Sequence, residues 1–258
     1  MVSLRGGMSA KMATAPTAAK RKSQDDGAPQ KKKQKKVRED DADLDVEAGL
    51  NRAFERMDGQ LLADHIAKKT TRFGTDLSTV ELSDLYISAT VLKDTTSWQK
   101  PRTQENFPEF LEAFSENPEK LQQAPKALGS PHTILVAGAG QRAADLVRAV
   151  RTFQQKGNPV AKLFAKHFKL EEQVSFLKKT RTGIAVGTPQ RLMDLIDDGA
   201  LNITSLRRIV IDASHIDQKK RGITDMKETM MPLAKLLSRK ELKEKYENAE
   251  KSLDLIFY

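Results

Sequence analysis

A turn with two glycines, Gly138 and Gly140, lies where a nucleotide could bind. The stretch Gly138-Ala139-Gly140-Gln141-Arg142-Ala143 fits the pattern G-x-G-x-x-A, because it follows an apolar run and opens a helix-like pattern. In dinucleotide-binding proteins such a turn brings the backbone close to the pyrophosphate. The next apolar run should then end in a carboxylate that binds the ribose, but it reads VAKLFAKHF, where only Lys162 and Lys166 leave a weak NADP option. The turn therefore has the form of a dinucleotide site without its chemistry.

A phosphate loop is also missing. The chain contains no Gly-Lys-Ser or Gly-Lys-Thr, so the lysine and hydroxyl that hold the terminal phosphates and magnesium have no counterpart. Asp212 is expected to be a structural acceptor at a strand end. His215 and Asp217 next to it could belong to a metal or acid–base site, but no third ligand and no hydroxyl nucleophile accompany them in a recognisable setting. With no cysteine, a thiolate zinc site and disulfides are excluded. We expect no catalytic residue, no metal and no cofactor.

The elements that would position these residues alternate along the chain. Strand-like runs at 134–138, 160–165, 183–188, 206–213 and 253–258 are separated by helical patterns at 141–155, 170–179, 189–198 and 225–249. Short apolar strands alternating with helices predict an α/β fold with a mostly parallel sheet flanked by helices. Upstream, helical spacing predicts helices over 45–70 and 105–124. Residues 74–104 have no clean period and are too apolar for a free linker, so we expect them to pack on their own domain or on a partner.

The order of motifs between Val186 and His215 resembles the first lobe of the DEAD-box RNA helicases. Thr188-Pro189-Gln190-Arg191-Leu192 matches T-P-G-R-L at a helix start, and Asp212-Ala213-Ser214-His215 stands where the family has D-E-A-D. The resemblance covers about residues 130–258. It implies a single RecA-like, P-loop-NTPase-like lobe over 131–258, preceded by a helical and extended segment at 41–130 that packs on the lobe or extends it.

Departures from that family argue against catalysis. No phosphate loop precedes the strand at 134–138, and the position of the glutamate that activates water holds Ala213. Loss of such a base typically costs about 100- to 10,000-fold in rate. The resemblance therefore implies a degenerate lobe, and we predict that the chain is not an enzyme.

With catalysis excluded from the prediction on these grounds, the function that the resemblance still implies for these motifs is contact with RNA. Thr188 and Arg191 match positions that contact the RNA backbone in the family, and Gln141 and Arg142 open the helix at a second such element. The alternative for Thr188 is a structural one, because a threonine before proline caps a helix in either case. RNA binding through Gln141, Arg142, Thr188 and Arg191 is thus an expectation taken from the resemblance.

The net charge of +9 belongs to the N-terminus. Residues 1–38 hold eleven Lys and Arg against two Asp, whereas residues 39–258 hold 33 bases and 33 acids. Two basic clusters with a short spacer predict a bipartite nuclear-import signal that binds an import receptor; its residues are Lys20, Arg21, Lys22, Lys31, Lys32, Lys33, Lys35 and Lys36. A generic solubilising or RNA-touching tail is the alternative. This composition cannot bury a core, so residues 1–40 are predicted to be disordered.

Together, the basic tail, the L-S-D-L-Y segment at 82–86 and the lone helicase-like lobe resemble the Cms-one ribosomal small-subunit family, nucleolar proteins associated with the 90S pre-ribosome. The resemblance implies a non-catalytic assembly factor for early small-subunit (pre-18S rRNA) maturation, located in the nucleus and nucleolus. Its partners would be pre-ribosomal RNA and 90S proteins, with no membrane and no small-molecule substrate. Two alternatives stay open: a nucleotide-dependent enzyme (an ATPase completed by a partner lobe, or a dinucleotide-binding oxidoreductase), and an adaptor that presents residues 74–104 to proteins.

Overall fold

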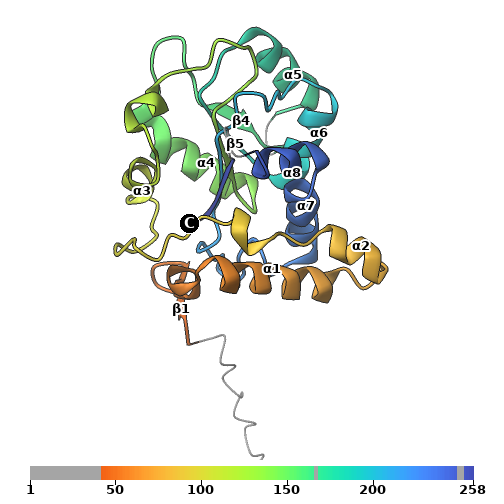
Figure 1. Ribbon diagram of the computed structural model, residues 1–258. Helices are drawn as coiled ribbons and strands as arrows, with labels where there is room; N and C mark the ends of the chain where they lie inside the picture. Colours follow the sequence, from red (N-terminus) through yellow and green to blue (C-terminus); the bar gives the residue numbers. More distant parts are fainter. Residues whose placement is uncertain (1–41, 166–167, 249–252) are drawn as a thin grey trace, which may run out of the picture. The chain divides into compact units, whose positions relative to one another are not determined.

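Five parallel strands form the centre of the protein in a computed structural model that describes residues 42–165, 168–248 and 253–258. The strands are β3 (Thr133–Val136), β4 (Ala161–Leu163), β5 (Ile184–Gly187), β6 (Arg208–Ile211) and β7 (Asp254–Phe257), in the spatial order β4-β5-β3-β6-β7. β3 lies in the middle, paired with β5 and with β6. The predicted α/β class with a mostly parallel sheet is confirmed (Figure 1).

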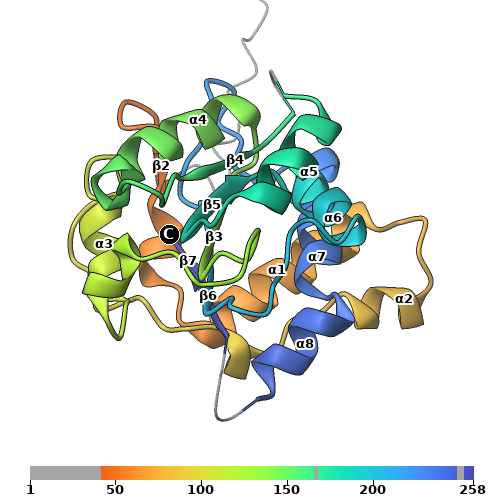
Figure 2. The same cartoon turned by 90° about the horizontal axis from the view of Figure 1, so that it is seen from above.

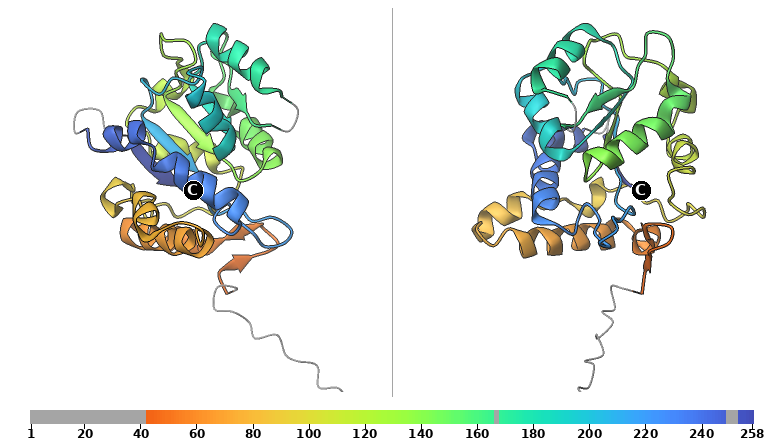
Figure 3. Two further views of the ribbon diagram at one scale, coloured as in Figure 1. Left: turned by 90° about the vertical axis from the view of Figure 1, so that its right-hand side faces the viewer. Right: turned by 180° about the vertical axis from the view of Figure 1, so that it is seen from behind.

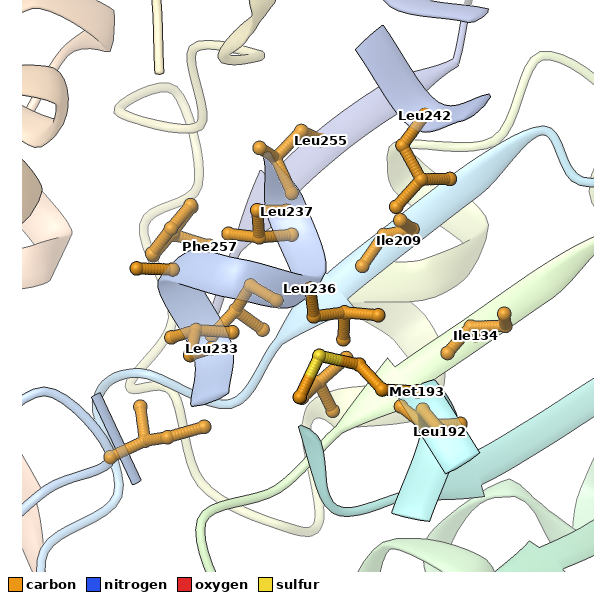
Figure 4. Close-up of a cluster of buried hydrophobic side chains, with 14 of the residues drawn as sticks. Ile134, Leu192, Met193, Ile209, Leu233, Leu236, Leu237, Leu242, Leu255 and Phe257 are labelled. Carbon is orange, nitrogen blue, oxygen red and sulfur yellow. The ribbon is translucent and has the colours of Figure 1, made fainter. Parts of the chain in front are cut away.

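Side chains that alternate along each strand supply two separate cores. On β6, Ile209 and Ile211 face one core and Val210 faces the other. β7 repeats the pattern, with Leu255 and Phe257 in the first core and Ile256 in the second. Because successive strand residues point to opposite faces, three apolar residues in a row are buried only when both faces are covered. Figure 4 shows the first core, where Leu233, Leu236 and Leu237 meet the sheet.

The helices cover both faces. One face carries α5 (Leu170–Lys179), α6 (Pro189–Asp197), α7 (Lys227–Leu237) and α8 (Lys240–Tyr246); the other carries α3 (Phe107–Ala113) and α4 (Gly140–Ala149) (Figures 1 and 2). The expectation of one helix over 225–249 was wrong, because the chain turns at Ser238 and Arg239 between α7 and α8. The helix expected over 105–124 is likewise divided, since a 3-10 turn at Pro118–Gln122 follows α3 separately.

The N-terminal segment differs most from its predicted helix at 45–70. It begins with a two-residue antiparallel pair, β1 (Leu44–Asp45) and β2 (Leu50–Asn51), whose turn places Gly49 at a φ of 67°. A left-handed residue of this kind interrupts a helix, and glycine adopts it without strain. A 3-10 turn at Arg52–Arg56 follows, and α1 (Gly59–Phe73) starts only where the Asp58 carboxylate accepts from the Leu61 N–H. α1 then packs against α7 below the sheet (Figures 1 and 3).

Residues 74–104 pack on the same body. After α2 (Thr79–Asp84) and a 3-10 turn at Ala89–Val91, Leu92 forms a parallel bridge to Leu255, and the Lys93 N–H donates to the Leu255 carbonyl at 2.9 Å. The chain thereby covers the outer edge of β7. Trp98 follows and packs edge-on against Phe110, with ring centroids 5.4 Å apart. All described residues belong to one compact unit.

Within the described residues, no helix is long and apolar enough to span a bilayer. The predicted import-signal residues, and the tail expected to be disordered, lie outside the described residues.

Candidate nucleic-acid interface at the carboxyl edge of the sheet

The four predicted RNA-contacting residues lie on two neighbouring helices at one edge of the sheet. α4 begins just after β3 and carries Gln141 and Arg142, while α6 begins just after β5 and carries Thr188 at its start and Arg191 in its first turn. The ends of β3 and β5 are adjacent, because Val136 pairs with Gly187 and the Ala137 N–H donates to the Gly187 carbonyl at 2.9 Å. Both helix starts therefore meet at the carboxyl edge, where ligands bind in folds of this type.

The glycine turn before α4 accommodates the protein's own chain. A Cβ added at Gly138 would lie 3.2 Å from the Ile223 Cβ and 3.3 Å from the Ile223 Cα. Ile223 is buried and belongs to the loop that connects β6 with α7. The missing side chain at Gly138 thus allows close approach of this loop, which gives the glycine a packing role.

Asp212 is committed to an ion pair inside the domain. Arg142 donates from Nε and Nη2 to the two Asp212 carboxylate oxygens, at 2.7 and 2.8 Å, and the two residues are only 8% and 2% exposed. Burial alone would lower the pKa of Arg142, but the facing carboxylate raises it above its ordinary value. Bidentate geometry of this kind is among the strongest that an arginine forms. Arg142 accordingly acts as the counter-ion of Asp212, and the predicted RNA contact of Arg142 would have to compete with this pair.

The same end of the sheet is closed further by Tyr258 and Arg102. The Tyr258 hydroxyl donates to the Thr103 carbonyl at 2.6 Å, and burial raises the pKa of this tyrosine. Arg102 is fully buried and donates to the Phe257 carbonyl at 2.7 Å and to the Thr95 hydroxyl at 2.9 Å. Burial lowers the pKa of Arg102 to about 10, which leaves it charged at neutral pH. Beside β6 and β7, the chain's own side chains thus fill the carboxyl edge.

The helix starts beside β3 and β5 are open by comparison. Ala139 and Thr188 precede α4 and α6, and neither makes a side-chain capping hydrogen bond. The alternative of a purely structural Thr188 predicted that its hydroxyl caps the helix. Pro189 does occupy the first turn of α6, but the Thr188 hydroxyl forms no capping hydrogen bond. The first N–H groups of a helix point outward and carry a partial positive charge, which favours a phosphate.

Arg191 has a structural partner as well. Its Nη1 donates to the Gln173 side-chain oxygen at 2.6 Å and to the Phe168 carbonyl at 3.1 Å. Gln173 in turn donates from its amide nitrogen to the carbonyls of Lys162 and Phe164, at 2.7 and 3.1 Å, along the outer side of β4. Arg191 is half-buried and holds this amide in place.

Nothing in the described part of the chain assembles into a metal site. No group of three His, Asp or Glu is suitably placed there. Ala213 follows Asp212 and is buried, so no carboxylate stands in the position of a water-activating base. Arg102, Gln173, Ile223 and Tyr258 also shape this edge, and the sequence did not predict them, because a buried arginine or glutamine carries no local signal that distinguishes it from an exposed one.

Comparison with known proteins assigns the chain to a family. The family model described as "CMS1: U3-containing 90S pre-ribosomal complex subunit" matches residues 10–258. The chain belongs to the CMS1 family. The predicted resemblance to the Cms-one family is therefore confirmed.

Curated relatives agree with this assignment. Protein CMS1 of Chaetomium thermophilum is 70% identical over 241 residues, which cover 93% of this chain and 96% of that protein. Protein cms1 of Schizosaccharomyces pombe is 32% identical over 184 residues, covering 71% of this chain and 64% of the relative. Human Protein CMSS1 is 36% identical over 104 residues, which span 40% of this chain and 37% of the human protein.

Solved structures of helicases are also similar to this chain. The yeast DEAD-box splicing factor Prp28 matches 54% of this chain and 32% of its own, at 17% identity and a TM-score of 0.41. Prp28 of Chaetomium thermophilum, in a structure bound to ADP, matches 88% of this chain and 52% of its own, at 17% identity and a TM-score of 0.36. The fold assignment made above depends on the strand order and pairing.

Proposed function

We propose that this CMS1-family chain is a non-catalytic assembly factor that acts in early small-subunit maturation, within the 90S pre-ribosome of the nucleolus. The family description and the 70% identical relative support a role in ribosome biogenesis. The RecA-like lobe would serve as a binding surface for pre-ribosomal RNA, for proteins of the particle, or for both.

The observation that carries the non-catalytic part is the Arg142–Asp212 pair. In the helicases that the lobe resembles, the corresponding aspartate holds magnesium through water. Here both carboxylate oxygens of Asp212 accept from Arg142, in a site that is closed to solvent. Releasing Asp212 for a metal would leave a buried guanidinium unpaired, and breaking a buried pair of this kind costs about 3–5 kcal/mol.

RNA contact is proposed at the open helix starts. The first turns of α4 and α6 would bind backbone phosphates, with Gln141 and the Thr188 hydroxyl beside them. Arg191 would add charge at the rim through the part of its guanidinium that does not hold Gln173.

A replacement of the ion pair tests this function in cells. The double variant Arg142→Met/Asp212→Leu keeps the volume and removes both charges, a change that is often neutral or stabilising for buried pairs. In cells depleted of the endogenous protein, this variant should restore pre-18S rRNA processing and should sediment with large pre-ribosomal particles, as the wild type does.

Failure of a folded double variant to restore processing would contradict the proposal, because it would mean that Asp212 has a chemical role. Circular dichroism and a urea titration of the purified variant establish that it is folded. Arg148→Met/Asp145→Leu, which replaces an exposed pair on the same helix, serves as the control.

A further inference from the structure

A groove of about 850 Å³ runs beside β4, at the lateral side of the sheet. It adjoins the carboxyl edge, because Phe168 and Gln173, which line it, both accept hydrogen bonds from Arg191. Its lining residues come from α4 and the 3-10 turn at Val150–Phe153 on one side and from α5 on the other. Figure 2 shows these elements next to β4. Its apolar lining includes Val147, Val160, Phe168 and Phe176. This volume lies in the range of about 300–1,000 Å³ that ligand pockets span.

The exposed edge of β4 is already capped, which limits how a partner could bind. The outward carbonyls of Lys162 and Phe164 both accept from the Gln173 amide, and Gln173 is 3% exposed. An added β-strand would have to displace this amide to pair with the edge. The groove is therefore suited to side chains inserted from outside, because its backbone acceptors are taken.

The rim of the groove is basic. Arg151 and Lys162 line it, are exposed, and form no ion pair with any described residue. The acid in the lining is Glu172, whose carboxylate accepts from the Lys169 N–H at the start of α5. An occupant that is apolar in the middle and acidic at its ends would complement this arrangement.

Charge argues against two occupants that belong to the protein itself: the basic tail, and a second copy bound in a symmetric contact. Residues 1–38 carry +9, so the basic rim would repel them. In a two-fold contact of groove on groove, a second copy of the chain would bring an identical basic rim against the first. We propose that the groove binds a short segment of a partner protein, in which an apolar side chain is flanked by Asp or Glu. This inference rests on the proposed function in one respect: a non-catalytic subunit of a particle acts by binding other proteins of that particle.

Selection from a random peptide display library against the purified full chain tests this proposal even though the partner is unidentified. We expect an enriched consensus in which an aliphatic or aromatic residue stands next to two or more acids. Fluorescence anisotropy with a labelled consensus peptide should then show a loss of about tenfold in affinity for Arg151→Glu/Lys162→Glu. Lys156→Glu, an exposed basic residue in the adjacent turn that does not line the groove, should bind as the wild type does.

Three results would overturn the proposal: no enriched consensus, a consensus without acids, or an equal loss of affinity in Lys156→Glu. Displacement of the peptide by a short oligouridine RNA, with RNA affinity lost in the double variant, would assign the groove to nucleic acid instead. Thr188→Asp separates this inference from RNA binding at the carboxyl edge, since it should leave peptide affinity unchanged.

Discussion

The two halves of the carboxyl edge contrast in how they use their polar groups. Beside β6 and β7, Asp212, Arg102 and Tyr258 are buried and bonded to the protein's own side chains and carbonyls. Beside β3 and β5, two helices begin without side-chain caps. We call the part of the edge beside β6 and β7 the closed half, and the part beside β3 and β5 the open half.

The difference separates two kinds of chemistry that a sheet edge of this type can support. Metal-dependent phosphate chemistry needs a carboxylate and a basic phosphate loop that face solvent, and the closed half has given its carboxylate to Arg142. Anion binding needs outward N–H groups at a helix start, and the open half has two helix starts without side-chain caps. Under the proposed function, the lobe binds anions at its open half and carries out no phosphate chemistry at its closed half.

The largest effect is expected from breaking the closed half. Arg142→Ala leaves the Asp212 carboxylate buried and unpaired, so the free energy of unfolding should fall by about 3–5 kcal/mol. Arg148→Ala removes an exposed partner of Asp145 on the same helix and should cost less than about 1 kcal/mol. Urea denaturation followed by circular dichroism measures both. Similar, small losses in the two variants would show that the closed half is not held by its ion pair.

Removal of the second arginine should have a smaller effect. Arg102→Met preserves most of the volume but removes the donor to the Thr95 hydroxyl and leaves the Phe257 carbonyl with only the long 3.4 Å bond from Thr95. This loss should cost about 2 kcal/mol. Arg181→Met, at an exposed arginine, should change stability by less than about 0.5 kcal/mol. If Arg102→Met were as stable as the wild type, the hydrogen bonds of Arg102 would contribute nothing to closing this half.

A negative charge at the open half should lower the affinity for RNA and raise the stability of the protein. Thr188→Asp places a carboxylate at the start of α6, where it should cap the helix and raise stability by about 0.5 kcal/mol. The same charge repels phosphate, so affinity for a labelled short RNA should fall about fivefold, or about 1 kcal/mol.

Thr204→Asp provides the matched control for that change. Thr204 is exposed and precedes β6 at the opposite edge of the sheet, so RNA affinity should stay at the wild-type value. An equal loss in both variants would indicate binding by overall charge, and would contradict a localised site at the open half.

The smallest expected effect is a dependence of protein stability on pH, which arises from His215 in the closed half. Burial lowers the pKa of His215, with opposing contributions from Asp212 and Arg142, so the unfolded chain takes up a proton at higher pH than the folded one. Stability should fall as pH decreases below the ordinary histidine value of about 6.5. The melting temperature of His215→Gln should decrease less than that of the wild type between pH 7 and pH 5. Parallel curves would show that His215 is solvated.

The sequence predicted the parallel sheet because its strands are short apolar runs that alternate with helical patterns. It also placed Gln141 and Thr188 at helix starts, since strand-to-helix turns leave a clear local pattern. The partner of Arg142 could not be predicted in this way, because Asp212 is 70 residues further along the chain and the pair is formed only by the sheet register. The hairpin before α1 was missed for a related reason: the apolar spacing from Leu50 to Ile66 is helical, and it concealed the turn at Gly49.

One pair of titrations decides whether the closed and open halves differ in what they bind. The purified full chain is titrated with a fluorescent ATP analogue and magnesium, and in parallel with a labelled short RNA with and without ATP. We predict saturable RNA binding that is independent of ATP, and no saturable nucleotide binding up to millimolar concentration. Saturable ATP binding, or RNA binding that requires ATP, would contradict the separation of a closed half from an open one.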